Sequence, residues 1–120
     1  MQFKGQENQV ALGRYADAER LFGRYMDEYG DLPPLTYAAR TGLAACREAQ
    51  GDLAGAAQAY TAVAEASPDD PSSALALMDA ARCWRMQGDA AQQRAALERV
   101  THDYATTPVA QRARQQLNLL

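Results

Sequence analysis

Apolar residues recur at steps of three and four along most of the chain. Such a stripe runs along one side of a helix, because an α-helix has 3.6 residues per turn. The clearest stripes are Tyr15-Ala18-Phe22-Tyr25-Tyr29, Leu53-Ala56-Tyr60-Val63 and Ala90-Leu97-Val100-Tyr104. They predict helices near 14–29, 35–50, 53–66, 72–87, 90–104 and 109–119, after a poorly patterned helix that ends near residue 12.

Three glycines begin similar segments at nearly equal spacing. Gly13 precedes Gly51 by 38 residues, and Gly88 follows 37 residues later. Each follows one helical pattern and precedes another, which favours a turn with positive φ. Asp52 and Asp89 come next and are expected to cap the following helices. The spacing therefore predicts a repeated helix pair.

Prolines divide the predicted repeats. Pro33-Pro34 and Ser67-Pro68-Asp69-Asp70-Pro71 separate them, and Pro108 precedes the last stretch. Asp70-Pro71 and Thr107-Pro108 each read as a helix cap followed by proline in the first turn. We expect one domain with repeats near 1–32, 34–68 and 71–105 and a C-terminal helix at 108–119. The apolar ending Leu117-Asn118-Leu119-Leu120 suggests either excision from a longer protein or an end-to-end dimer, since terminal repeats usually have a polar cap.

This arrangement resembles the tetratricopeptide repeat (TPR) over about residues 11–119. In the second repeat the residues that fall in family order are Leu43, Ala44, Gly51, Leu53, Ala56, Tyr60, Val63 and Pro68. The third repeat keeps Leu77, Ala80, Ala81, Trp84, Leu97 and Val100. Gln93 stands where a small residue belongs, and the leading segment around Phe3 departs from the pattern. The resemblance implies an all-α protein, a right-handed α-solenoid of about three helix pairs plus a C-terminal helix.

The repeats are longer than the usual ~34 residues, with the additional residues around the prolines. In this they are similar to bacterial envelope TPR proteins: the Tol-Pal-associated cell-division coordinator, outer-membrane assembly lipoproteins and the ancillary Sec translocon subunit. Tyr104-Ala-Thr-Thr-Pro108 is the clearest match. The resemblance implies a periplasmic or membrane-anchored location facing the periplasm. A cytoplasmic location is the alternative.

Composition excludes several other classes. The chain has 120 residues, with 26 Ala, only 4 Val and no Ile, which argues against a sheet protein. Apolar residues make up 48% and the net charge is −3, so disorder is not expected. The pI near 5.0 argues against nucleic acid as a partner. No apolar run approaches the ~20 residues that cross a bilayer.

Stacking of the repeats would produce a recognition surface. Small Ala44, Ala56 and Ala81 let helices approach, while Phe22, Tyr60, Trp84 and Leu97 fill the space between them, and the tyrosines of the stripes are expected to face inward. The first helix of each pair would line a concave face. Its expected residues are Tyr37, Thr41, Ala45, Glu48, Leu75, Met78, Arg82, Arg85, Met86, Arg112 and Gln115.

This face predicts a groove for an extended or helical segment of another protein, with acidic residues as a natural match for arginine. The alternative is a solvated surface whose arginines pair with Asp79 and Glu48. The expected function is a non-enzymatic protein-interaction scaffold, with no cofactor, as a monomer or weak homodimer. Self-association within a larger membrane-anchored protein is the alternative.

Other candidate sites are weaker. His102 lacks a predictable acid and nucleophile, so a surface histidine is expected. Asp69-Asp70 is better explained as a turn and helix cap than as a metal site. Cys46 and Cys83 occupy equivalent places in consecutive repeats, where helix spacing is too large for a disulfide, so we expect buried thiols.

Overall fold

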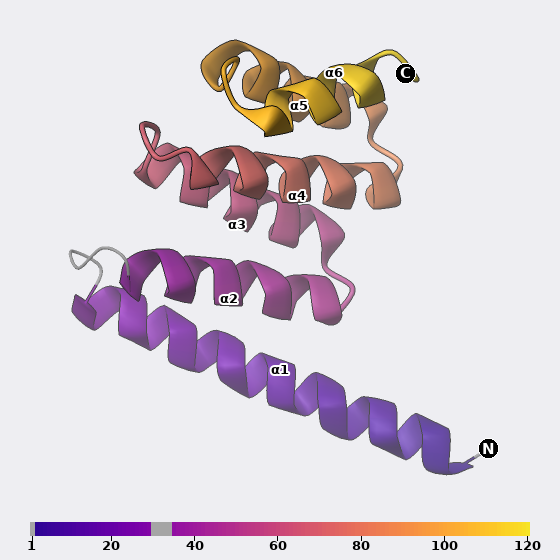
Figure 1. Ribbon diagram of the computed structural model, residues 1–120. Helices are drawn as coiled ribbons and strands as arrows, with labels where there is room; N and C mark the ends of the chain where they lie inside the picture. Colours follow the sequence, from indigo (N-terminus) through magenta and orange to yellow (C-terminus); the bar gives the residue numbers. More distant parts are fainter. Residues whose placement is uncertain (1, 30–34) are drawn as a thin grey trace.

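The part of the chain that the structure describes contains six helices, which follow one another in a stack (Figure 1). The computed structural model describes residues 2–29 and 35–120, with side chains described for 13–29 and 37–120. The helices are α1 (Gln2–Tyr29), α2 (Leu35–Ala49), α3 (Leu53–Ala66), α4 (Ser72–Gln87), α5 (Ala90–Asp103) and α6 (Pro108–Leu117). Each helix packs mainly on its neighbours in the chain. The described ranges contain no strand, and the predicted all-α repeat solenoid is confirmed.

The predicted break at Gly13 is wrong. α1 is continuous for 28 residues and carries Gly13 in its interior. A glycine inside a helix costs only about 1 kcal/mol relative to alanine, and alanines at 11, 16 and 18 favour helix on both sides. The described helices therefore form two hairpins, α2–α3 and α4–α5, between the single helices α1 and α6. The Pro33-Pro34 break lies outside the described residues.

The two hairpin turns have the predicted geometry. Gly51 and Gly88 take φ values of +86° and +85°, the left-handed region that glycine enters without a steric penalty. Asp52 accepts a hydrogen bond from the Gly55 amide at 3.0 Å and so caps α3. Asp89 caps α5 in the same way through the Gln92 amide, also at 3.0 Å.

The proline-containing connections are fastened to the helices that follow them. Asp70 accepts a hydrogen bond from the Ser72 amide at 2.9 Å at the start of α4. Thr107 caps α6 through the Ala110 amide at 3.3 Å, with proline in the first turn. The Tyr104 hydroxyl donates to the Pro68 carbonyl at 2.8 Å, which joins the end of α5 to the loop of the preceding repeat.

The core consists of two apolar clusters that meet at α4. The first contains Ala44, Ala56, Ala57, Ala59, Tyr60, Ala80 and Cys83. The second contains Ala64, Ala74, Leu77, Ala81, Ala96, Leu97, Val100, Tyr104, Ala110 and Ala113. α4 contributes to both because it lies between α3 and α5. The predicted small contacts Ala44, Ala56 and Ala81 are all buried.

The expectation that all the stripe tyrosines face inward is wrong for Tyr15 and Tyr29 of α1. Tyr60 and Tyr104 are buried, but Tyr15 and Tyr29 are 43% and 46% exposed. Among the described helices α1 packs chiefly against α2, so only part of its apolar stripe is covered. Where the two helices meet, a Cβ on Gly42 would lie 2.5 Å from the Phe22 ring, so this glycine permits the close approach.

Candidate functional site

The predicted binding residues lie on α2, α4 and α6, the helices that begin each repeat. We use the name α2–α4–α6 face for this set of predicted residues: Tyr37, Thr41, Ala45 and Glu48 on α2, Leu75, Met78, Arg82, Arg85 and Met86 on α4, and Arg112 and Gln115 on α6. α4 contacts α6 directly. An ion pair joins α4 to α2.

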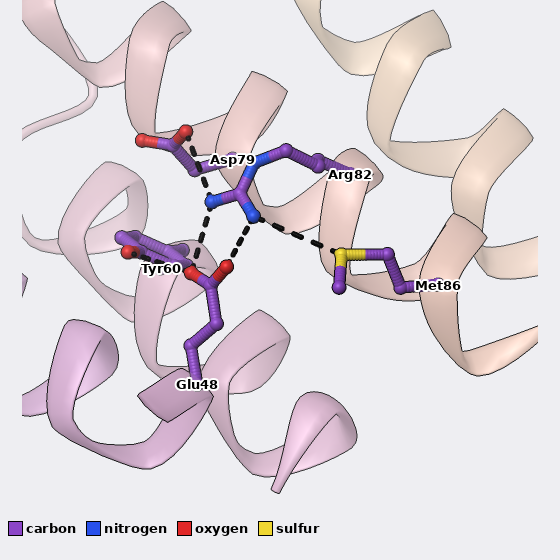
Figure 2. Close-up of polar contacts among 5 residues, drawn as sticks. All are labelled: Glu48, Tyr60, Asp79, Arg82 and Met86. Carbon is purple, nitrogen blue, oxygen red and sulfur yellow. Dashed lines mark hydrogen bonds and ion pairs between the residues drawn. The ribbon is translucent and has the colours of Figure 1, made fainter. Parts of the chain in front are cut away.

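That ion pair is the centre of a polar cluster between the two repeats (Figure 2). Arg82 binds both oxygens of Glu48: Nη2 donates to Oε1 at 2.9 Å, and Nη1 contacts Oε2. Arg82 Nη2 also lies 3.5 Å from Asp79 Oδ1. The Tyr60 hydroxyl donates to Glu48 Oε1 at 3.3 Å. The cluster therefore joins α2, α3 and α4.

The titration of these groups follows from their contacts. The hydrogen bond from Arg82 holds the pKa of Glu48 below its usual value, so this carboxylate stays charged at neutral pH. Burial raises the pKa of Asp79, and burial together with the Glu48 charge raises the pKa of Tyr60 to about 12. Arg82 thus lies against two carboxylates. For this arginine the structure agrees with the alternative prediction, a solvated surface whose arginines pair with Asp79 and Glu48.

Arg85 and Arg112 have a different environment. Both are exposed, and neither has an ion pair or hydrogen bond with any of the described residues. Exposed apolar side chains accompany Arg85 on α4, with Leu75 at 47% and Met86 at 55% exposure. Met86 Sδ lies 3.9 Å from Arg82 Nη1. α4 therefore carries both an unpaired positive charge and accessible apolar side chains.

The other predicted residues are less available. Met78 is partly buried and packs against the second core cluster, as do Val109 and Leu117 of α6. The Thr41 hydroxyl donates to the Tyr37 carbonyl one turn earlier, at 2.7 Å. Of the predicted binding residues, polar contacts between side chains join only Arg82 to Glu48 and Met86.

A hollow between α1 and α2 was not predicted. It has a volume of about 380 Å³ and is lined by Leu21, Phe22, Tyr25, Ala38 and Ala39. Leu21 is 63% exposed and stands one position before Phe22, outside the apolar stripe from which the helix was predicted.

On the same pair of helices Glu19 accepts hydrogen bonds from Arg47 at 2.9 Å and Gln50 at 3.1 Å. Its pKa is lowered, chiefly by the bond from Arg47.

The weaker candidates show no catalytic arrangement within the described ranges. The His102 side chain is 89% exposed beside Asp103, as expected of a surface histidine. Cys46 and Cys83 are free and buried, and burial raises the pKa of Cys83 to about 11, so the thiol stays protonated. No three His, Cys, Asp or Glu side chains of the described part gather as metal ligands do. None of its helices is long and apolar enough to span a membrane.

Comparison with known families decides what this stack of helices is. A family model of the tetratricopeptide repeat matches residues 7–71, more than half of the chain. The chain belongs to the tetratricopeptide repeat family. The match covers most of α1, all of α2 and α3, and the connection to α4. The comparison with curated proteins gave no match. TPR domains generally mediate protein–protein interactions and are typically non-enzymatic scaffolds.

Proposed function

We propose that this TPR domain holds a segment of a partner protein on the α2–α4–α6 face, which we take to be the concave side of the solenoid. The observation that carries the proposal is the exposure of Leu75 and Met86 on α4, the helix that also carries the unpaired Arg85. Apolar contacts supply binding energy, and hydrogen bonds from an arginine guanidinium group fix the orientation of the bound segment. Peptide-binding grooves usually combine these two kinds of contact.

Rigidity of this face supports the proposal. α4 is held from both sides by the two core clusters, and Arg82 ties it to α2 through Glu48. A surface that is already ordered loses little conformational entropy when a partner binds. When a peptide binds here, most of the conformational entropy lost is therefore that of the peptide.

Replacing exposed apolar side chains by glutamine tests the location of the site. A library of displayed peptides would first be selected on the intact chain. We expect Leu75→Gln and Met86→Gln each to weaken a selected peptide about 5-fold or more, because an apolar contact worth about 1 kcal/mol is lost. Leu21→Gln on α1 is the control, and its affinity should stay unchanged. Loss of binding only in the Leu21 variant would move the site to the hollow between α1 and α2.

Self-association is the second candidate function. Leu119 is 85% exposed and Leu21 63%, so apolar side chains are accessible on both α1 and the segment after α6. Light scattering on eluted fractions across a concentration series would distinguish the two functions. A dimer that Leu119→Gln dissociates supports self-association, whereas a monomer at high concentration favours the scaffold.

The setting that we propose for this scaffold is bacterial envelope assembly or cell division. The support is the spacing of 37 residues between the hairpin glycines Gly51 and Gly88 and the proline-containing connections, which resemble those of envelope TPR proteins. The test is fractionation of cells that express the gene for this protein. Recovery of the protein in the cytoplasm would contradict this setting and leave the peptide-binding proposal unaffected.

A further inference from the structure

We infer that the partner segment is acidic and that Arg85 and Arg112, rather than Arg82, bind its carboxylates. This inference rests on the function proposed above and adds the chemistry of the partner. Its basis is a separation of charge between the helices of the repeats.

The first helices carry most of the arginine and little acid. α2, α4 and α6 together contain six arginines against Glu48 and Asp79, a net charge of +4. The whole chain has a net charge of −3. Acidic side chains are therefore concentrated on the other helices and the loops. Of the residues that define the α2–α4–α6 face, Arg82, Arg85 and Arg112 stand against Glu48 alone, three positive charges against one negative, a net charge of +2. This face is therefore positive on an otherwise acidic protein, which attracts an anionic segment to this side.

Arg82 is not free to bind a partner. Its two terminal nitrogens already contact both oxygens of Glu48, and Asp79 lies beside it. A partner carboxylate at this point would meet two negative charges and would have to displace Glu48. Binding at Arg82 therefore gains little.

Arg85 and Arg112 can accept a carboxylate without displacing anything. The acids of α2 and α4, Glu48 and Asp79, both contact Arg82, and none of the described carboxylates pairs with Arg85 or Arg112. A guanidinium group presents two parallel donors to a carboxylate, so each free arginine can bind one acidic side chain.

The apolar residues give the length of the segment. Leu75 and Met86 stand eleven positions apart on α4, which corresponds to roughly 16 Å at a rise of 1.5 Å per residue. An extended peptide covers this span with about five residues at about 3.3 Å each. The fitting partner is thus a short extended stretch that contains Asp or Glu as well as apolar side chains.

Nucleic acid fits this surface less well. Its backbone carries a phosphate every few ångströms and is bound by many cations together. The α2–α4–α6 face offers two unpaired arginines together with an exposed leucine and an exposed methionine. The acidic remainder of the protein would repel the rest of the strand.

The test selects peptides of about twelve residues, longer than the five that span the face, from an unbiased displayed library. We expect enrichment of Asp and Glu next to apolar residues. A selected peptide should bind about 5- to 10-fold more weakly to Arg85→Gln and to Arg112→Gln, and its affinity should fall as salt is added. Arg24→Gln, which removes an exposed arginine from α1, should bind it as wild type does.

Each contrary result has a distinct meaning. Enriched peptides without acidic residues would overturn the charge inference and leave the peptide-binding function intact. An equal loss in the Arg24→Gln variant would also overturn it, because the effect would then follow net charge and not this face. Tighter, Arg85-dependent binding of a single-stranded oligonucleotide would replace the acidic peptide with nucleic acid. Recovery of no peptide at all would contradict the proposed function itself.

Discussion

Glycines in this protein have opposite roles that depend on backbone conformation. Gly51 and Gly88 lie in the left-handed region at the hairpin turns, whereas Gly13 lies inside α1. The sequence around Gly13 is similar to that around Gly51 and Gly88. Only the structure, in which α1 continues through Gly13, distinguishes it from the two turn glycines. Substitution by alanine should therefore have opposite effects on stability at the two kinds of site.

Gly88→Ala should lower the free energy of unfolding by about 1 kcal/mol, because a Cβ is unfavourable at φ +85°. Gly13→Ala should raise it by roughly 0.5–1 kcal/mol, because alanine favours the helix and nothing lies within 4 Å of the added methyl group. Urea denaturation measures both. Destabilisation by Gly13→Ala would indicate that a turn interrupts α1.

The Glu48–Arg82 pair makes the free energy of unfolding depend on pH in the acidic range. Since the folded-state pKa of Glu48 is lowered, the contribution of this carboxylate is complete above its unfolded value near 4.5 and is lost as the pH falls through the folded pKa. Glu48→Gln should cost about 1 kcal/mol at pH 7, and this difference from wild type should shrink as the pH approaches 3. Thermal melting at several pH values measures it.

Glu65→Gln is the matched control. Glu65 is 63% exposed and lies 3.6 Å from Arg99, and exposed pairs of this kind contribute little. We expect its unfolding temperature to stay close to that of wild type at pH 7. A difference between wild type and Glu48→Gln that persists unchanged at low pH would show that the ion pair is not its origin.

At the scale of whole helices, burial depends on the number of neighbours. α4 lies between α3 and α5 and buries both sides, so Ala80 and Ala81 are each almost inaccessible. α1 packs mainly on α2 and leaves Tyr15 and Leu21 exposed. The same kind of apolar stripe therefore produces a core in one helix and a partly open surface in another.

Ala81→Glu should destabilise the protein by about 3 kcal/mol or more, because a carboxylate would be buried among Leu77 and Leu97 without a partner. Ala95→Glu introduces the same group at an exposed position of α5 and should change the free energy of unfolding by less than about 0.5 kcal/mol. Chemical denaturation compares them. Equal stability of the two variants would contradict the stacking of α4 on α5.

In the whole molecule the helices form a nearly one-dimensional stack whose contacts are mostly between neighbours. Stability in such a stack is carried by the interfaces between adjacent helices, so it should be greatest in the middle and decrease towards elements with one neighbour. The binding face that we propose is centred on α4, the most completely packed helix.

Hydrogen exchange should show this gradient. We expect the amides of α3 and α4 to exchange most slowly, and those of residues 13–29 in α1 at least about tenfold faster, because opening α1 disrupts essentially one helix interface. Mass spectrometry of peptic fragments gives the rates. Slower exchange in α1 than in α4 would contradict the gradient.

The sequence alone determined the elements whose signals are local. Helix bounds from 35 onwards, the turns at Gly51 and Gly88 and the caps Asp52, Asp89 and Thr107 were predictable, since each depends on a few adjacent residues. The TPR order of small and large residues was also readable. The continuity of α1 was not, because a glycine preceding a helical stripe looks the same inside a helix as at a turn.

Only the tertiary structure decided which side chains are free. Arg82 and Arg85 stand three positions apart on one helix, and both read as exposed cations. Arg82 is paired because Glu48, 34 residues earlier, lies opposite it across the repeat interface. Tyr15 and Leu21 are exposed because the described structure places no second helix against that side of α1. Periodicity specifies which residues share a face, but what covers that face depends on residues distant in the chain.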